Sequence, residues 1–309
     1  MTTRYRLQAK HQILYLRALI IQKIRQFFIE NDYLEIETPC RIPEPIPEAF
    51  IDSIESESWY LQTSPELCMK KLLASGLPKI FQLSKCFRAN ERSDTHLPEF
   101  TLLEWYRSNA NYEQLMDECE NLFIHIAQST INTIQFDYQG VPISLSPPWK
   151  RMSVTEAFDQ FSQISLAEAL QKETFDEIMV YHIEPGLGLQ PVFLYDYPKE
   201  RAALARLSPN NPKIAERFEL YIGGHELANA FSELTDPIEQ RKRFQDELAE
   251  RKSFQKSVYP TPESFLKSLN HLPETAGIAL GIDRLIMLFA DVPTIDQVVA
   301  FTMEDLTLE

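Results

Sequence analysis

The stretch FRANERSDTHLPEFTLLEWYR, residues 87–107, decides the fold. Its polar middle is flanked by two apolar runs, KIFQLSKCF before it and EFTLLEWY after it. Two apolar runs around a polar loop that contains Ser93 and Asp94 predict an antiparallel hairpin. Side chains alternate across a strand, so Glu104 and Tyr106 are expected on one face of the second strand. The arginines, acids, histidine and aromatics gathered here exceed what a surface hairpin needs, and they indicate a site for a polyanion beside an amine.

The composition excludes several classes of protein. The chain has 309 residues, 44% of them hydrophobic, and a net charge of −15. Clustered Lys and Arg are needed for a broad nucleic-acid surface, so this charge argues against one, although an acidic surface also simply aids solubility. No apolar run approaches 18 residues and the N-terminus lacks a signal-peptide pattern, so we expect a cytoplasmic protein without a membrane partner. The four cysteines form no CxxC pair, which predicts reduced thiols.

Apolar periodicity predicts the remaining elements. Residues 12–30 carry a helical stripe, and Tyr33–Pro39 alternates as a strand closed by proline. This pair is either a dimer element or a peripheral helix covering the sheet of a monomer. Ser64-Pro65-Glu66 opens a helix that ends near Ser75. A capped helix start alone explains these residues as well as a role in the site does. The segment between the strand and this helix, 41–57, is expected to be loop, followed by a short strand at 59–62. Further expected elements are a helix at 112–131, a strand pair within 132–150, a peripheral mixed region at 153–181, strands at 190–197, 214–222 and 276–282, and helices at 237–254 and 283–289.

The stretch ELYIGGHELANAFSELTD, residues 219–236, spaces three acids by seven. A turn at Gly223-Gly224 would make two adjacent strands, so that Glu219 and Glu226 face each other across a hairpin. Two carboxylates on one face suit Mg²⁺ shared with phosphate oxygens. The alternative is a pair of exposed acids on a sheet.

Two further groups of residues complete the chemistry. Glu233, with Asn229 and Phe231, combines an acid, an amide and an aromatic among small residues, which suits an ammonium group. In GIALGIDR, residues 277–284, small residues precede Arg284, which can meet phosphate at a helix start. A P-loop, a GxGxxG motif and a nucleophile–base set are absent from the sequence. Together the residues indicate nucleotide phosphate held by arginines and Mg²⁺ beside an amino-group ligand.

In order and spacing, Phe87–Tyr106, Glu219–Asp236 and Gly277–Arg284 resemble the catalytic core of the class II lysyl-tRNA synthetases. The helix and strand ending at Pro39 resemble the first motif of that family, FRANE to HLPEF the second, and GIALGIDR the third. The resemblance implies an α+β fold: a single catalytic domain over 1–309, with a mostly antiparallel sheet flanked by helices and a homodimer built on the first motif. Only about eleven residues precede the first helix, so no anticodon-binding domain is expected.

Within this family the chain more closely resembles the free-standing elongation factor P–(R)-β-lysine ligases. TSPELCMKKLL, PEFTLLEWYR and ELANAFSELTD carry this likeness, and Ala279 stands where the tRNA synthetases have glycine. One added methyl typically changes discrimination by ~1–3 kcal/mol, enough to favour an isomer with a shifted amino group. The implied reaction activates lysine or β-lysine as an adenylate with ATP and transfers it to a lysine of elongation factor P, without tRNA. The alternatives are a truncated lysyl-tRNA synthetase and a catalytically silent regulatory subunit.

The resemblance also implies roles for individual residues, with ATP and Mg²⁺ as cofactors. The catalytic residues are expected to be Arg88 and Arg284. ATP binding is expected at Arg88, Asn90 or Glu91, His96, Leu97, Phe100, Glu226, Leu227, Gly281 and Arg284. Substrate binding is expected at Ser64, Pro65, Glu66, Glu104, Tyr106, Asn229, Phe231, Glu233 and Ala279. Mg²⁺ is expected at Glu219 and Glu226.

Three departures from the family pattern affect these roles. In the family pattern, Asn-Glu directly follows the arginine, whereas this chain has Ala89-Asn90-Glu91 after Arg88. The adenine-contacting residue is therefore Asn90 by position or Glu91 by chemistry. Leu97 replaces an asparagine, so any ATP contact there uses the backbone. Ala230 replaces a glycine between Asn229 and Phe231, which crowds the amine pocket.

Overall fold

The computed structural model describes residues 3–307, which form two compact units. The first unit comprises the chain up to Asn109, Thr235–Thr275 and the chain from Ala279 on. The second comprises Ala110–Leu234 and Ala276–Ile278. Strand β13 (Thr275–Gly281) thus gives its middle residues to the second unit and its flanking residues to the first.

The first unit consists of helices and strands from the N-terminal and C-terminal parts of the chain. Its elements are α1 (Thr3–Glu30), β1 (Leu34–Glu35), β2 (Arg41–Ile42), β3 (Glu55–Ser56), β4 (Trp59–Leu61), α2 (Glu66–Ala74), β5 (Lys79–Phe87), β6 (Glu99–Ser108), α8 (Pro237–Ser253), α9 (Glu263–Ser268), the short 3-10 helices η3 (Leu269–His271) and η4 (Ile295–Gln297), α10 (Ile282–Phe289) and α11 (Met303–Thr307).

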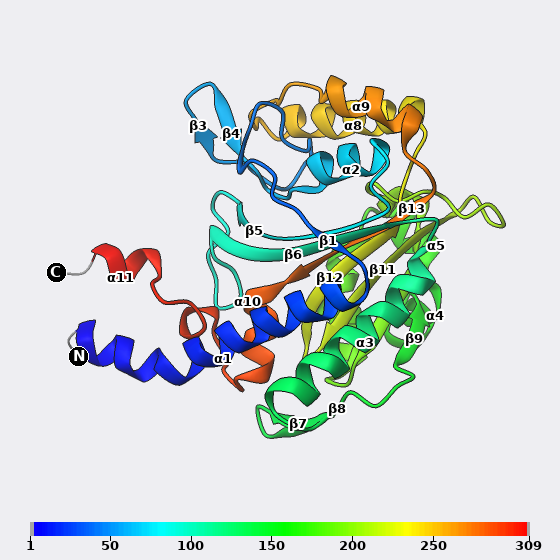
Figure 1. The fold of residues 1–309 in the computed structure, drawn as a ribbon. Coiled ribbons are helices and arrows are strands. Elements are labelled where there is room, and N and C mark those ends of the chain that lie inside the picture. Colours follow the sequence, from blue (N-terminus) through cyan, green and yellow to red (C-terminus); the bar gives the residue numbers. More distant parts are fainter. Residues whose placement is uncertain (1–2, 308–309) are drawn as a thin grey trace. The chain divides into compact units, whose positions relative to one another are not determined.

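The predicted hairpin is confirmed as β5 and β6. The two strands pair antiparallel without interruption from Lys79 opposite Arg107 to Phe87 opposite Glu99. Figure 1 shows α2, α8 and α9 on one side of this hairpin and α1 with α10 on the other. The hairpin is therefore covered on both faces, and the loop at its end, residues 88–98, is held at a fixed place in the unit.

Helix α1 packs on the hairpin through an aromatic cluster. Phe28 stacks on Phe81, with ring centroids 4.7 Å apart, and lies 5.1 Å from the centroid of Trp105. The strand predicted at 33–39 is much shorter, because β1 covers only two residues paired parallel with β5. Pairing ends after the N–H of Ile36 donates to the Phe81 carbonyl at 3.0 Å.

The segment expected to be loop, 41–57, contains two short strands. Strands β2 and β3 both pair antiparallel with β4 to form a small three-stranded sheet. The prediction of loop was wrong at these positions, since two-residue strands give no periodic apolar signal.

The second unit consists of a sheet with helices packed against it. Its elements are α3 (Tyr112–Thr130), β7 (Gln135–Tyr138), β8 (Val141–Ser144), β9 (Lys150–Ser153), α4 (Val154–Phe161), α5 (Leu166–Gln171), α6 (Phe175–Ile178), the π-helix η1 (Met179–Ile183), α7 (Glu184–Leu187), β10 (Val192–Pro198), the 3-10 helix η2 (Lys199–Arg201), β11 (Ile214–Ile222) and β12 (His225–Ser232).

Strand pairing in the second unit follows the order β13-β12-β11-β10-β9. Strands β10, β11 and β12 are antiparallel, whereas β9 pairs parallel with β10. The strand pair predicted within 132–150 is confirmed as the β7–β8 hairpin. Strands β11 and β12, which carry Glu219 and Glu226, lie in the middle of this order of strands.

The region at 153–181, expected to be peripheral and mixed, is helical and contributes to a hydrophobic core. It forms α4 to α6 and the start of η1, and its apolar residues pack into a core cluster with residues of β10 and β11. Gly186 in α7 allows close packing there, because a Cβ at this position would lie 2.6 Å from the Phe161 ring.

The helices and the cysteines of the described part of the chain have the following properties. Among the helices between residues 3 and 307, none combines the length and apolar character needed to cross a bilayer. The four cysteines are free thiols; Cys86 and Cys119 are buried, and Cys40 is exposed.

Candidate active site

Arg88 lies directly after the end of β5 and faces Phe100 on β6. Its backbone N–H donates to the Pro98 carbonyl at 2.9 Å, which closes the hairpin loop. The guanidinium carbon lies 5.1 Å from the centroid of the Phe100 ring, and one Nη lies 3.8 Å from the Glu91 carboxylate. The Nε–H is buried and donates no hydrogen bond to any residue that the structure describes. A buried, uncommitted N–H favours binding of an anion.

His96, in the same loop, contacts Arg284 of α10. A guanidinium nitrogen of Arg284 contacts His96 Nε2, and Arg284 Nε donates to the Thr95 carbonyl at 3.3 Å. Burial and the positive charges of Arg284 and Arg88 lower the pKa of His96 to about 4. His96 is therefore neutral at pH 7, with Nε2 accepting from Arg284. The proton then lies on Nδ1, which is 2.8 Å from Ser93 Oγ and donates to it.

The hairpin loop places Asn90 and Glu91 differently. Asn90 has a left-handed backbone with φ of 65°, is exposed and lines a cavity of about 280 Å³ with Arg251 and Tyr259. Glu91 is half-buried beside Arg88. Leu97 as a whole is buried, at 6% exposure.

Ser64, Glu104 and Tyr106 form a buried hydrogen-bonded group in the first unit. Ser64 Oγ donates to one Glu104 oxygen at 2.6 Å, and the Tyr106 hydroxyl donates to the other at 2.8 Å. Glu104 is completely buried. Burial and the nearby Glu66 raise the pKa of Glu104 to about 7, although the two hydrogen bonds and Lys70 oppose this shift. Both hydrogen bonds come from neutral hydroxyls, so a bound ammonium group would stabilise the charge of this carboxylate.

Glu66 begins α2 and is paired with a lysine. Its N–H donates to Ser64 Oγ at 3.0 Å, while Pro65 occupies the N-cap position without a side-chain cap. Lys70, 1% exposed, forms an ion pair with Glu66 one helical turn away. Ser64 therefore takes part in both the helix start and the site, and the two local interpretations of this stretch are compatible.

In the second unit, the hairpin predicted around Gly223-Gly224 is confirmed as β11 and β12. Both glycines have positive φ, 65° and 78°, as a two-residue hairpin turn requires. Tyr221 pairs with Glu226, and Glu219 lies two residues before Tyr221 on the same strand. Glu219 and Glu226 therefore share one face of the hairpin.

A bulge in β12 extends this shared face. Leu220 pairs with Ala228 while Tyr221 pairs with Glu226, so Leu227 is an extra residue. After the bulge, Asn229 lies opposite Glu219. Without the bulge, Glu226 and Asn229, three residues apart, would point to opposite faces.

Arg217 connects the residues of this face. It forms an ion pair with Glu219 at 2.5 Å, and its Nε donates to Asn229 at 3.2 Å. Its guanidinium carbon lies 4.4 Å from the Tyr197 ring centroid and 5.8 Å from that of Phe231. Burial opposes the charge of Arg217, but Glu219 and the other acidic groups outweigh burial and raise its pKa.

Two tyrosines complete the coordination of Glu219. The hydroxyls of Tyr197 and Tyr221 donate to the same Glu219 oxygen at 2.6 and 2.7 Å. Burial, followed by the negative charge of Glu219, raises the pKa of both tyrosines well above the usual value. Both hydroxyls therefore stay protonated and remain donors at neutral pH.

The acids of this face fit a magnesium site only in part. Glu219 and Glu226 are hard oxygen donors on one face, which suits Mg²⁺ bound together with phosphates and water. Within residues 3–307, no three His, Cys, Asp or Glu side chains gather as a metal site. Glu219 already accepts hydrogen bonds from three donors, and Glu226 is half-buried.

The remaining predicted residues are placed as follows. Leu227 and Glu233 are buried, at 2% exposure each, whereas Phe231 is half-buried. Ala279 is half-buried in β13, and Gly281 is the N-cap of α10.

Sequence reasoning missed Lys70 and Arg217. Lys70 lies four residues after Glu66 in a predicted helix, a spacing that favours an ion pair. Arg217 lies two residues before Glu219 in a predicted strand and therefore on the same face. Both signals were present, but neither indicates that the pair is buried.

Comparison with known proteins shows the family to which the chain belongs. A family model described as tRNA synthetases class II (D, K and N) matches residues 2–305. The chain is 34% identical to the lysine–tRNA ligase of Carboxydothermus hydrogenoformans, over 93% of this chain and 64% of that protein. It is 36% identical to the lysine–tRNA ligase of Moorella thermoacetica, over 94% and 65%. It is also 36% identical to the elongation factor P–(R)-β-lysine ligase of Hamiltonella defensa, over 93% and 94%.

The chain belongs to the class II tRNA synthetase family of the D, K and N type. The predicted fold class is confirmed: an α+β catalytic domain with a large, mostly antiparallel sheet flanked by helices. The chain spans 64–65% of the length of the two lysine–tRNA ligases above.

Proposed function

We propose that this protein activates a lysine-type amino acid with ATP, forming an aminoacyl adenylate and pyrophosphate. The observation that carries the proposal is Arg88, with a buried, uncommitted Nε beside Phe100. The amino-acid carboxylate attacks the α-phosphate, and pyrophosphate leaves. Arg88 stabilises the charge that develops on the transferred group.

The other residues of the first unit position the two substrates. Arg284 and the neutral His96 bind the phosphates, and Glu91 rather than Asn90 contacts adenine, because Asn90 faces solvent and a separate cavity. Phe100 packs on the base, and Gly281 with the Leu97 backbone allows close approach. Ser64, Glu66, Glu104 and Tyr106 bind the amino groups of the substrate.

Residues of the second unit have complementary roles. Glu226, supported by Glu219, holds Mg²⁺, which neutralises phosphate charge when it is bound. Glu233, Asn229 and Phe231 bind the side-chain ammonium. Arg217 orients both groups of residues through its bonds to Glu219 and Asn229.

We further propose that the amino acid is (R)-β-lysine and that the acceptor is a lysine ε-amine of elongation factor P. The similarity to a relative named for this reaction supports the acceptor. The methyl group of Ala279, at a half-buried position of β13, supports the altered amino-acid preference. The ε-amine attacks the adenylate carbonyl, an amide bond forms, and AMP leaves.

Transfer to tRNA is the second candidate. The observation that favours it is the 34–36% identity to lysine–tRNA ligases, equal to the identity with the elongation factor ligase. Purified protein is given each lysine isomer with either tRNA or elongation factor P. Charging of tRNA with α-lysine, without modification of the factor, would reverse the proposed acceptor.

A homodimer through α1 and β1 is also proposed. Tyr15 and Ile29 on α1 are 78% and 59% exposed, and Leu34 on the edge strand β1 is 51% exposed. Light scattering should give twice the chain mass for wild type and a lower mass for Tyr15→Glu with Leu34→Glu. An unchanged mass in the variant would place the interface elsewhere.

Arg88→Ala is the direct test of activation. We expect ATP–pyrophosphate exchange to fall by a factor of about 10³ or more, because the residue acts on the transferring phosphoryl group. Arg41→Ala, which removes an exposed arginine paired with Glu57, is the matched control and should retain exchange. Activity in Arg88→Ala within tenfold of wild type would contradict the assigned role.

Ala279→Gly tests the amino-acid preference. We expect the ratio of kcat/KM for α-lysine to that for (R)-β-lysine to rise about tenfold, the effect of one methyl group. Exchange assays with both isomers measure this ratio. An unchanged ratio would remove Ala279 from the specificity argument.

A further inference from the structure

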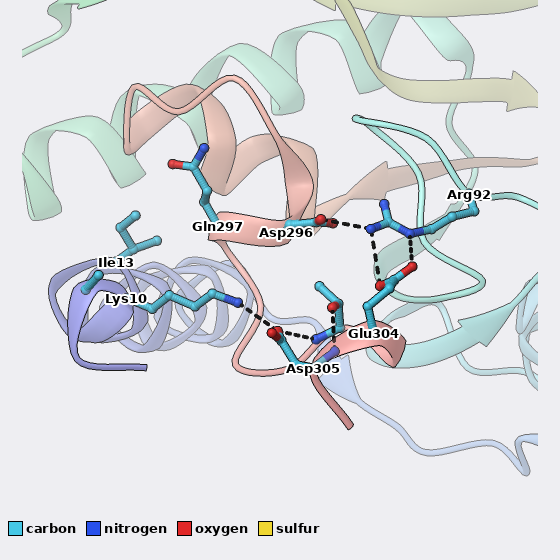
Figure 2. A pocket seen from close by; sticks show the side chains of 9 residues that line it. Lys10, Ile13, Arg92, Asp296, Gln297, Glu304 and Asp305 are labelled. Carbon is cyan, nitrogen blue, oxygen red and sulfur yellow. Dashed lines mark hydrogen bonds and ion pairs between the residues drawn. The ribbon is translucent and has the colours of Figure 1, made fainter. Parts of the chain in front are cut away.

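Arg92 lies in the same hairpin loop as the proposed ATP-binding residues, but its side chain points away from them. Figure 2 shows it directed toward the C-terminal segment, across a cleft of about 470 Å³. Its Nε donates to Glu304 at 3.0 Å and one Nη donates to Asp296 at 2.8 Å. The same Nη also lies 3.3 Å from the second Glu304 oxygen, so the Glu304 pairing is bidentate.

The backbone of the loop is attached to the same segment. The Ile295 N–H donates to the Asp94 carbonyl at 2.8 Å, and a third Arg92 nitrogen donates to the Ser93 carbonyl at 2.9 Å. Ser93 and His96 bond to each other through their backbones, which makes residues 93–96 a tight turn. A displacement of the loop at Arg92 would therefore move His96 as well.

Glu304, which accepts from Arg92, lies in α11, and the neighbouring residue Asp305 attaches this helix to the rest of the unit. Asp305 accepts from the Thr302 N–H at 3.1 Å and pairs with Lys10 of α1 at 3.3 Å (Figure 2). The Asp305 N–H donates in return to Thr302 Oγ1 at 3.2 Å. These bonds attach α11 to α1 and hold Glu304 toward Arg92.

We propose that Arg92 is a positioning residue for the nucleotide: Asp296 and Glu304 hold the loop so that its other side presents Glu91, His96 and Leu97 to ATP. The inference rests on the proposed function, because it assigns the loop to ATP. Exposed ion pairs contribute little to global stability, so the effect is expected in loop order and ATP affinity instead. A fork–fork pair restricts geometry in a way that a single lysine contact cannot.

Hydrogen exchange of the free protein tests loop positioning without reference to activity. In Arg92→Ala, amides of residues 89–97 should exchange about tenfold faster than in wild type, since the loop opens more often. Arg241→Ala is the matched control: Arg241 forms a bidentate pair with Glu263 at 2.5 and 2.7 Å, with similar exposure, in the same unit. It should leave the loop unchanged. Equal exchange in wild type and Arg92→Ala would overturn the inference.

Steady-state pyrophosphate exchange gives the second readout. Arg92→Ala should raise KM for ATP about tenfold and change KM for lysine less than about twofold, with Arg92→Lys intermediate. Glu304→Ala should show the same kind of effect but a smaller one, because Asp296 still pairs with Arg92. The double variant should be no worse than Arg92→Ala, because the Glu304 contact is already lost in that variant. Equal increases in both KM values, or additive effects, would reject a positioning role.

The two readouts separate the proposals. If wild type exchanges pyrophosphate with no lysine isomer, the proposed function fails, and hydrogen exchange alone decides the loop inference. If wild type is active but Arg92→Ala retains wild-type loop exchange, the inference fails and the proposed function stands. Should Arg92→Ala not fold, Glu304→Ala and Asp296→Asn supply the same comparison from the other side of the contact.

Discussion

Glu104 in the first unit and Glu219 in the second are two buried carboxylates with opposite kinds of partner. Glu104 is fully buried and accepts from two neutral hydroxyls, those of Ser64 and Tyr106. Glu219 is 8% exposed and accepts from two tyrosines and from Arg217. The direct hydrogen-bond partners of Glu104 are therefore neutral, whereas Glu219 has the cationic partner Arg217. In this chain, a buried acid with neutral partners is therefore the better candidate for binding a substrate ammonium.

The largest expected effect comes from removing the cation. Arg217→Met leaves Glu219 buried beside neutral groups, and the free energy of unfolding should fall by ~3–5 kcal/mol. Urea denaturation of the variant measures this loss. Arg151→Met, which breaks the exposed pair with Asp117, is the control and should cost less than about 1 kcal/mol. Equal losses in the two variants would remove the distinction between the carboxylates.

The next effect is a pH dependence at Glu104. Its pKa is raised in the folded state to about 7, so the folded protein binds the proton more tightly than the unfolded chain does. The resulting stability is present at low pH and is lost as pH rises through 7. Between pH 5 and pH 8 the loss from this group should be about 2–3 kcal/mol, and Glu104→Gln should abolish it.

Urea unfolding of wild type and Glu104→Gln at both pH values measures this difference. Glu99→Gln, at an exposed position of the same strand, is the matched control and should retain the wild-type dependence. Lysine added at pH 8 should stabilise wild type more than Glu104→Gln. Parallel stability curves for wild type and Glu104→Gln would show that the Glu104 carboxylate does not titrate near pH 7.

The smallest expected effect separates the tyrosine donors. Tyr106→Phe removes a hydrogen bond that lowers the Glu104 pKa, so the decline in stability above pH 5 should grow by about 1 kcal/mol. Tyr197→Phe should cost about 1–2 kcal/mol, because it removes a buried hydrogen bond to Glu219. Unchanged stability in Tyr197→Phe would contradict this contribution.

Local patterns in the chain were enough for the elements that carry the site. Alternating apolar residues predict β5 and β6, and therefore place Arg88 at a strand end and Glu104 with Tyr106 on one face. The two consecutive glycines predict the turn between β11 and β12, since both need positive φ. Spacing and turn chemistry are local properties, and these inferences needed no knowledge of the surroundings.

Burial and register could not be predicted in the same way. The extra residue at Leu227, which brings Asn229 opposite Glu219, produces no compositional signal in a strand of small residues. Lys70 has the spacing of an ordinary surface pair with Glu66, yet it is 1% exposed. Whether a charged pair is desolvated depends on which elements cover it, and this determines its effect on pKa and stability.

The sequence by itself determined the family, the hairpins and the chemical types available to the site, because these follow from residue identity and short-range spacing. Only the tertiary structure decided which charges meet. Arg92 and Glu304 are 212 residues apart, and nothing local to either predicts that they pair. Glu104 has neutral hydrogen-bond partners and Glu219 has Arg217, because the packing of strands and helices buries both acids but brings different donors to each of them.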